Sequence, residues 1–400
     1  MRRILAILTV LVTAACTEFR DPWDGSLKEL TVKAVYPAGH VASARQGVSV
    51  KIENIASGDS YTAFTDSEGK AAIQVRKGIY RISLSDRVGR DIFNGTADKV
   101  VVGEGGKQVL LNLSHSLAGT LVIKELYVGG CSKAPQEGTY QSDQYVILHN
   151  NDSETVYLDS LCFGTLSPYN ATGVNNWRKA DGSLPDFAPV VTVVWRFPGE
   201  GNSHPLAPGE EAVIALRGAI DHTRQYPLSV NLNREDCFVC YNPTYFPNPL
   251  YHPAPGDKIR PDHILDVVVK TGQSNANTVS ISSPTFLIFK AKGISMEEYV
   301  RQDDIIQVTP GNSADVIVKV PYEWVIDAVE VFDGGSSGNN KRLIPALDAG
   351  YVTQSGTFKG HSLMRKTDEE ASEKAGYTIL RDSNNSSEDF YESEVQSLHN

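Results

Sequence analysis

The first residues with a spacing that could support chemistry are cysteines. Four of them lie in the body of the chain: Cys131, Cys162, Cys237 and Cys240. Cys237 and Cys240 have the spacing of a zinc ligand pair or a redox pair, with His222 and His252 nearby. A structural zinc site usually shows two such pairs, and disulfides form in oxidising compartments. Three interpretations stay open: structural disulfides or buried thiols, a metal site, and redox chemistry.

Carboxylates in the segment 220–275 are a second candidate for chemistry. Asp257, Asp262 and Asp266 lie close together in the sequence. Glycoside hydrolysis requires two carboxyl groups about 5 to 10 Å apart, a separation that sequence spacing cannot establish across a β fold. A secreted hydrolase with its carboxylate pair in this segment is therefore the alternative hypothesis.

Two polar motifs near the C-terminus each resemble a known kind of site, a serine nucleophile and a calcium loop, but neither meets the requirements of that site. Gly334–Gly338 fits the Gly-x-Ser-x-Gly pattern around Ser336, but a nucleophile elbow needs a following helix, and residues 339–345 have no helical start. The run from Asp382 to Asp389 alternates oxygen side chains, but Ser387 and Ser393 stand where a calcium loop needs glycine and a carboxylate. The patterns favour a loop and a structural turn. We expect no enzyme activity, no metal and no cofactor.

An aromatic segment, residues 240–252, is the candidate binding surface. Its aromatic side chains are Tyr241, Tyr245, Phe246 and Tyr251. The prolines among them exclude a regular helix or interior strand. The rings must either cover the core or face a ligand, and aromatic side chains on a loop are typical of recognition surfaces.

The N-terminus resembles an export signal. A basic start at residues 1–3 precedes the apolar run 4–12, which is too short for a spanning helix. Thr13-Ala14-Ala15-Cys16 resembles the lipobox of bacterial lipoproteins. The resemblance implies a signal peptide at 1–15, lipidation of Cys16 and a spacer at 16–26. Acidic residues in that spacer loosely resemble those of surface-exported lipoproteins, which implies the outer membrane and the cell surface.

The charge of the chain excludes one class of partner. The formal net charge is −11, and loss of Arg2 and Arg3 with the signal makes it −11 − 2 = −13. A chain of this charge repels phosphate backbones, so we expect no nucleic acid partner. No second apolar run of spanning length follows the signal, so the expected membrane attachment is through Cys16 alone.

The region 27–115 shows the period of β-strands. Apolar residues alternate in 30–34, 48–52, 71–75 and 80–84, which places one set of side chains inward. We expect the turns at 66–69 and 77–78 to close hairpins. The segment from Thr65 to Ile82 is similar to prealbumin-like, carboxypeptidase-regulatory-like modules, which implies a seven-stranded spacer module without catalysis.

The region 119–395 resembles a lamin-tail-type domain. The resemblance rests on strands at 121–126, 143–151, 156–161 and 212–216, a Phe-Pro element at 197–198, and closing elements at 325–329, 362–366 and 382–390. It implies an immunoglobulin-like sandwich in which both ends of the region pair. Long insertions at roughly 165–190 and 220–275 interrupt the pattern.

Together these features predict an all-β chain of two β-sandwich domains, a prealbumin-like module and a larger immunoglobulin-like, lamin-tail-like sandwich with long insertions. This arrangement resembles a family of uncharacterised bacterial lipoproteins. The leading hypothesis is a membrane-tethered, surface-exposed binding or scaffolding lipoprotein whose partner at the cell envelope is a protein or a glycan.

Overall fold

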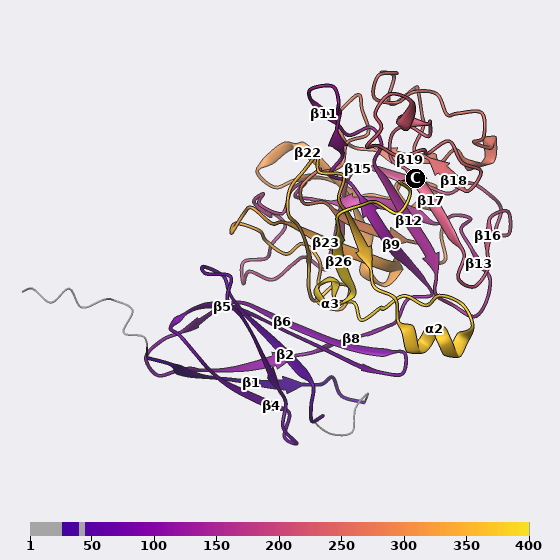
Figure 1. The fold of residues 1–400 in the computed structure, drawn as a ribbon. Helices are drawn as coiled ribbons and strands as arrows, with labels where there is room; N and C mark the ends of the chain where they lie inside the picture. Colours follow the sequence, from indigo (N-terminus) through magenta and orange to yellow (C-terminus); the bar gives the residue numbers. More distant parts are fainter. Residues whose placement is uncertain (1–25, 40–44, 400) are drawn as a thin grey trace, which may run out of the picture.

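The computed structural model describes residues 26–39 and 45–399. The expected signal peptide, Cys16 and most of the spacer lie outside the described residues. Figure 1 shows a smaller body of strands below a larger one, with the C-terminal segment between them. Among the described residues, no helix is long and apolar enough to cross a membrane.

Residues 28–117 form the smaller body. Its strands are β1 (Lys28–Val35), β2 (Ser49–Asn54), β3 (Ser60–Phe64), β4 (Lys70–Val75), β5 (Gly78–Val88), β6 (Asp91–Val102), β7 (Lys107–Asn112) and β8 (Ser114–Leu117). One sheet has the order β4-β1-β7 and the other β3-β2-β5-β6-β8. The alternating apolar residues of both sheets share one buried core, in which Leu30, Ile52 and Tyr80 are fully buried. The inward positions predicted from the period of two are therefore confirmed.

The predicted hairpins in this body are wrong. Asp66 does shape a turn, because its carboxylate accepts hydrogen bonds from the backbone N–H groups of Glu68 (2.8 Å) and Lys70 (2.9 Å). However, β3 pairs with β2 while β4 pairs with β1, so this turn carries the chain from one sheet to the other. The turn at 77–78 carries it back. Alternation identifies the buried face of a strand, but it does not identify the neighbouring strand.

The larger body contains two main sheets. The six-stranded sheet consists of β9 (Leu121–Tyr127), β12 (Tyr145–Asn150), β17 (Glu211–Ala215), β18 (Cys237–Val239), β25 (Ser362–Arg365) and β26 (Phe390–Ser393), in the order β18-β17-β12-β9-β25-β26. The eight-stranded sheet consists of β14 (Cys162–Leu166), β15 (Phe187–Arg196), β19 (Asp266–Lys270), β20 (Thr285–Phe289), β21 (Ile306–Thr309), β22 (Asn312–Pro321), β23 (Val325–Asp333) and β24 (Val352–Gln354). Its order is β21-β22-β15-β14-β20-β23-β24, with β19 paired to β15.

Short elements complete the larger body. The strand pairs are β10 (Cys131–Ser132) with β11 (Thr139–Tyr140), and β13 (Val156–Tyr157) with β16 (Pro205–Leu206). The helices are α1 (Met296–Tyr299), α2 (Glu369–Ala375) and α3 (Ser386–Asp389), with 3-10 turns η1 (His222–Arg224), η2 (Pro261–His263) and η3 (Tyr322–Trp324). Strands thus dominate, and the predicted all-β sandwich fold is confirmed.

Both main sheets are buried on both faces. In β12, Val146 and Leu148 face the core between the sheets, whereas Tyr145 and Ile147 face a second cluster on the outer side. The segment 219–232 supplies apolar residues to that outer cluster. The predicted insertion 220–275 therefore covers the outer face of the six-stranded sheet, and the segment 294–305 covers that of the eight-stranded sheet. Because both faces of each sheet are buried, these strands are continuously apolar rather than alternating.

The two ends of the larger body meet in one sheet. β25 pairs antiparallel with β9 near the start of the region and with β26 at its end. The expected pairing of both ends of this region is confirmed. It brings the C-terminal polar segment against the smaller body.

Candidate functional site

The two bodies meet along a seam that is held by polar side chains. Asn94 on β6 is fully buried, and its amide donates hydrogen bonds to the backbone oxygens of Ser383 and Asn384, both at 2.8 Å. Asn385 donates to the hydroxyl oxygen of Ser85 on β5 at 2.7 Å. These bonds fix the position of one sandwich on the other, since buried amides and carbonyls are costly to leave unpaired.

Arg81 and two stacked rings fix a second part of the seam. Arg81 lies on the outward face of β5, where Nε donates to the carboxylate of Asp98 at 2.7 Å. Its guanidinium carbon lies 5.3 Å from the ring centre of Phe332 and 5.1 Å from that of Tyr351. The rings stack at 4.2 Å, and the Tyr351 hydroxyl donates to Glu53 on β2. Burial and the Glu53 carboxylate raise the pKa of Tyr351, so it stays a neutral donor.

A tight polar loop, residues 333–340, follows β23 beside these rings. Asn339 donates to the backbone oxygens of Asp333 (2.8 Å) and Ser336 (2.6 Å). The Ser336 hydroxyl accepts a hydrogen bond from the N–H of Gly338 at 3.1 Å, and no helix follows. Ser336 is therefore a turn residue and not the serine of a nucleophile elbow, as its sequence context indicates.

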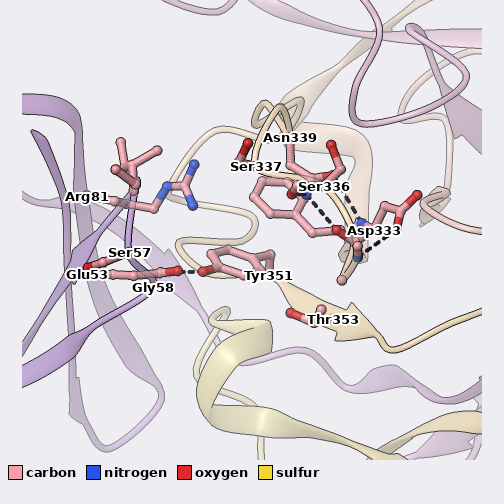
Figure 2. Close-up of a pocket in the computed structure, with 15 residues that line it drawn as sticks. Glu53, Ser57, Gly58, Arg81, Asp333, Ser336, Ser337, Asn339, Tyr351 and Thr353 are labelled. Atoms are coloured by element: carbon pink, nitrogen blue, oxygen red, sulfur yellow. Dashed lines mark hydrogen bonds between the residues drawn. The ribbon is translucent and has the colours of Figure 1, made fainter.

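Three adjoining hollows run along the seam at this loop, and we call them together the seam groove. The first, of about 300 Å³, is bounded by residues 53–58, Arg81, the loop 333–339 and Tyr351 (Figure 2). The second, of about 740 Å³, shares Arg81 and Ser337 with the first and adds residues 174–182. The third, of about 720 Å³, shares Asp98 and Arg178 with the second. Volumes of this size are those of ligand sites.

The four cysteines of the larger body are free, buried thiols, which is one of the arrangements expected from the sequence, and no disulfide joins them. Cys237 packs on the outer face of its sheet and Cys240 in the central core, because residues three apart in an extended chain point to opposite faces. Burial raises the pKa of Cys131, Cys162 and Cys237 to about 12, which keeps the thiols protonated and unreactive.

The histidines named with these cysteines are also engaged in structural bonds. His222 pairs with the Tyr140 hydroxyl at 2.8 Å, and His252 accepts from the N–H of Asn277 at 2.7 Å. Burial lowers the pKa of His252 to about 4. Within residues 26–39 and 45–399, no group of three metal-ligating side chains could hold an ion.

The three candidate carboxylates each accept a hydrogen bond from a different side chain. Asp257 accepts from Asn233 at 2.7 Å, Asp262 from Arg260 at 3.0 Å, and Asp266 from Arg196 at 2.7 Å. Hydrogen bonds from these neighbours lower the pKa of Asp257 and Asp262, so neither is suited to act as a general acid near neutral pH. The geometry gives no support to a hydrolase in this segment.

The aromatic segment divides between covering and exposed positions. Phe246 is 1% exposed and packs 5.7 Å from the ring of Trp195, so it belongs to the core and is not available to a ligand. Tyr241 is partly buried against the outer cluster. Tyr245 and Tyr251 are 46% and 44% exposed, and they remain the available part of the predicted surface.

The Asp-rich run near the C-terminus is a structural turn around an arginine. Arg365 on β25 contacts the carboxylates of Asp327 (2.6 Å), Asp382 (3.2 Å) and Asp389 (3.8 Å). Asp389 also accepts hydrogen bonds from the N–H and hydroxyl of Ser383, both at 2.8 Å. These carboxylates hold the seam segment in place, as expected for a turn rather than a calcium loop.

Sequence reasoning missed the seam groove. Its walls come from residues near 55, 81, 98, 178 and 335, which meet only when the two bodies dock. In the sequence, the loop 333–340 contains a serine motif, and its Asn and Gly content is the one signal that marks a structured polar turn.

Comparisons with known proteins agree with the fold. Residues 207–397 match the model of a family described as protein of unknown function, DUF4876. A crystal structure of a DUF4876 family protein from Bacteroides thetaiotaomicron is 25% identical, covers 91% of this chain and 94% of its own, and superposes with a TM-score of 0.58. The chain thus has the all-β fold of proteins from an uncharacterised family.

Other matches are much weaker. A DUF3823 family protein from Parabacteroides merdae is 11% identical, covers 35% of this chain and 66% of its own, and has a TM-score of 0.17, which is too low to support any inference. No curated protein matches the chain. The resemblances to prealbumin-like and lamin-tail-type domains stay predictions.

Proposed function

We propose that the protein is a lipoprotein tethered to the outer membrane through Cys16 and exposed at the cell surface, where it binds or scaffolds a protein or glycan partner without catalysis. The seam groove is the proposed contact site. The observation that supports it is the position of the groove: both sandwiches contribute walls, and buried hydrogen bonds hold those walls in a fixed relation.

A fixed groove favours binding because less conformational entropy is lost when a ligand enters. Arg81, Tyr351 and the 333–340 loop are already held by hydrogen bonds and ring contacts before any ligand arrives. The spacer expected at residues 16–26 would separate such a site from the lipid surface and leave it within reach of a partner.

Photo-crosslinking in intact cells tests the proposal. A diazirine amino acid replaces Ser337 or Val174, which are exposed in the groove, and in a matched control it replaces Leu110, which is 71% exposed on β7. We expect light-dependent adducts from both groove positions and none from position 110. Equal labelling at all three positions, or none in the groove, would contradict the proposed site.

A further inference from the structure

We propose that Arg217 binds the carboxylate group of an organic acid, beside the partly exposed side chains of Tyr169 and Tyr251. This site lies outside the seam groove, since none of the three residues lines it. The feature that carries the proposal is a buried guanidinium whose terminal nitrogens have no acceptor in the described part of the chain.

Arg217 lies just beyond the end of β17 and is only 3% exposed. Its Nε donates to the backbone oxygen of Asn277 at 3.2 Å. Among residues 26–39 and 45–399, its guanidinium forms no other hydrogen bond and no ion pair. Burial lowers the pKa of Arg217, but a guanidinium stays charged at neutral pH. A buried charge without partners is costly, and a bound anion would relieve that cost.

Asp143 faces Arg217 across the sheet but does not pair with it. The antiparallel register of β12 and β17 brings the two residues opposite each other where these strands end. The Asp143 carboxylate instead accepts hydrogen bonds from the hydroxyls of Tyr127 at 3.0 Å and Ser229 at 2.6 Å. Burial raises the pKa of Asp143 and so disfavours its charge. The positive charge of Arg217 is therefore left for another partner.

Tyrosine side chains surround the guanidinium. Tyr140, Tyr169 and Tyr251 lie close enough for their hydroxyls to act on the charge of Arg217. Tyr169 and Tyr251 are 39% and 44% exposed, so they connect the buried guanidinium to the surface. A phenol hydroxyl can donate to a carboxylate, and the ring offers apolar surface to the rest of an organic acid. Tyr251 also belongs to the aromatic segment that the sequence marks as a binding surface.

Asn277 and Gly218 hold this arrangement in place. The backbone oxygen of Asn277 accepts from Arg217, and its N–H donates to Nε2 of His252 at 2.7 Å. A Cβ atom at Gly218 would lie 2.9 Å from Cγ of Pro253, so the chain at Pro253 packs closely on the residue that follows Arg217. Burial lowers the pKa of His252 to about 4, and the charge of Arg217 acts in the same direction. His252 is therefore neutral at pH 7, and the guanidinium supplies the positive charge.

A carboxylate matches this site better than a phosphate. The two terminal nitrogens of a guanidinium can pair side by side with the oxygens of either group. One arginine balances the single charge of a carboxylate, whereas a phosphate dianion would keep a second charge without a buried partner. The partly exposed tyrosine rings further favour an organic acid over an inorganic ion.

Calorimetric titration of the detergent-extracted full chain tests this inference. The probes are benzoate and hexanoate, with benzamide as the neutral analogue of benzoate and with inorganic phosphate and sulfate for comparison. Arg217→Gln removes the charge, and Arg217→Lys keeps the charge but loses the two-point geometry. Arg224→Gln is the matched control, because Arg224 is an exposed arginine of the same body. Thermal unfolding of each variant shows whether it is folded, and Arg217→Lys carries the test if Arg217→Gln is not.

We expect saturable binding of at least one carboxylate, with a dissociation constant raised about tenfold or more by either Arg217 variant and unchanged by the control. Benzamide should not bind. Binding of phosphate or sulfate alone would overturn the assignment to a carboxylate. Absence of binding, or carboxylate binding that both Arg217 variants retain, would show that Arg217 has a structural role only and would overturn the proposal. Crosslinking from the seam groove tests the proposed function separately, so either can fail without the other.

Discussion

Phe246 and Tyr245 are neighbours in the sequence with opposite roles. Phe246 packs against Trp195 and lies 5.2 Å from the ring of His252, whereas Tyr245 is about half exposed. We expect Phe246→Ala to lower the free energy of unfolding by about 3 to 5 kcal/mol, because it removes a buried ring and leaves a cavity. Tyr245→Ala is the matched control and should change it by less than about 0.5 kcal/mol. Denaturant unfolding measures both, and equal losses would contradict this division.

Asp389 is a buried carboxyl whose charge is disfavoured. Burial raises its pKa to about 6, although Arg365 opposes the shift, and the Asp382 carboxylate raises it further. Burial likewise raises the pKa of Asp327 to about 7. The folded state therefore binds more protons than the unfolded state between about pH 4 and pH 6 to 7, and this contribution to stability is lost as pH rises through that range.

Replacing the Asp389 carboxyl group should remove its contribution to the pH dependence of the free energy of unfolding. We expect the stability of the wild type, relative to Asp389→Asn, to fall between pH 4.5 and pH 7 by about 2 kcal/mol. The comparison cancels groups common to both proteins, such as His252. Thermal unfolding across this range measures the difference, and one that is flat or rises with pH would show that Asp389 is charged throughout.

At the scale of elements, the polar seam depends on the β6 side chain Asn94. Its amide satisfies two backbone oxygens of the C-terminal segment. We expect Asn94→Ala to destabilise the protein by roughly 1 to 3 kcal/mol, because those partly buried oxygens lose their donor. The exposed Asn112 on β7 provides the control substitution to alanine. Scanning calorimetry of the Asn94 variant should show two unfolding transitions, one for each body, at separate temperatures. A transition like that of the control would mean that this part of the seam contributes little to the joint unfolding of the two bodies.

The buried faces of some strands could be predicted from the sequence, whereas the partners of other strands could not. In β1, β2, β4 and β5, the alternating pattern identified the buried side chains, because each strand has one face in water and one in a core. The same pattern gave the wrong partners for β3 and β4, because a turn residue such as Asp66 fixes the local backbone and not the sheet that follows. In the larger body, the segments 219–264 and 294–305 cover the outer faces of the two sheets, so strands such as β12 carry no alternation.

The candidate site was less accessible to prediction than the fold. Its walls combine residues more than two hundred positions apart, such as Arg81 and Phe332, and each residue type is ordinary for a turn or strand surface. The aromatic segment was conspicuous because its rings are clustered in sequence. The structure buries Phe246 and leaves Tyr245 and Tyr251 at the surface.

At the scale of the whole molecule, the proposed tether predicts where the protein is found. We expect Cys16→Ser to release the protein from the membrane fraction, because lipidation then has no acceptor and no helix of the described residues could span a bilayer. Fractionation without detergent measures this, with Cys162→Ser, a buried thiol of the larger body, as the control. Retention of the Cys16 variant in membranes would contradict the anchor.

The most direct test is to measure the hydrogen–deuterium exchange rates of backbone amides in the seam groove, once in native envelopes and once in the purified protein. The proposed function predicts slower exchange in the envelope for the groove segments 55–58, 174–182 and 333–340, because a bound partner shields their backbone. The strand β7 should exchange at the same rate in both samples. Unchanged exchange in the groove, or protection confined to residues 241–251, would contradict the assignment of the seam groove as the binding site.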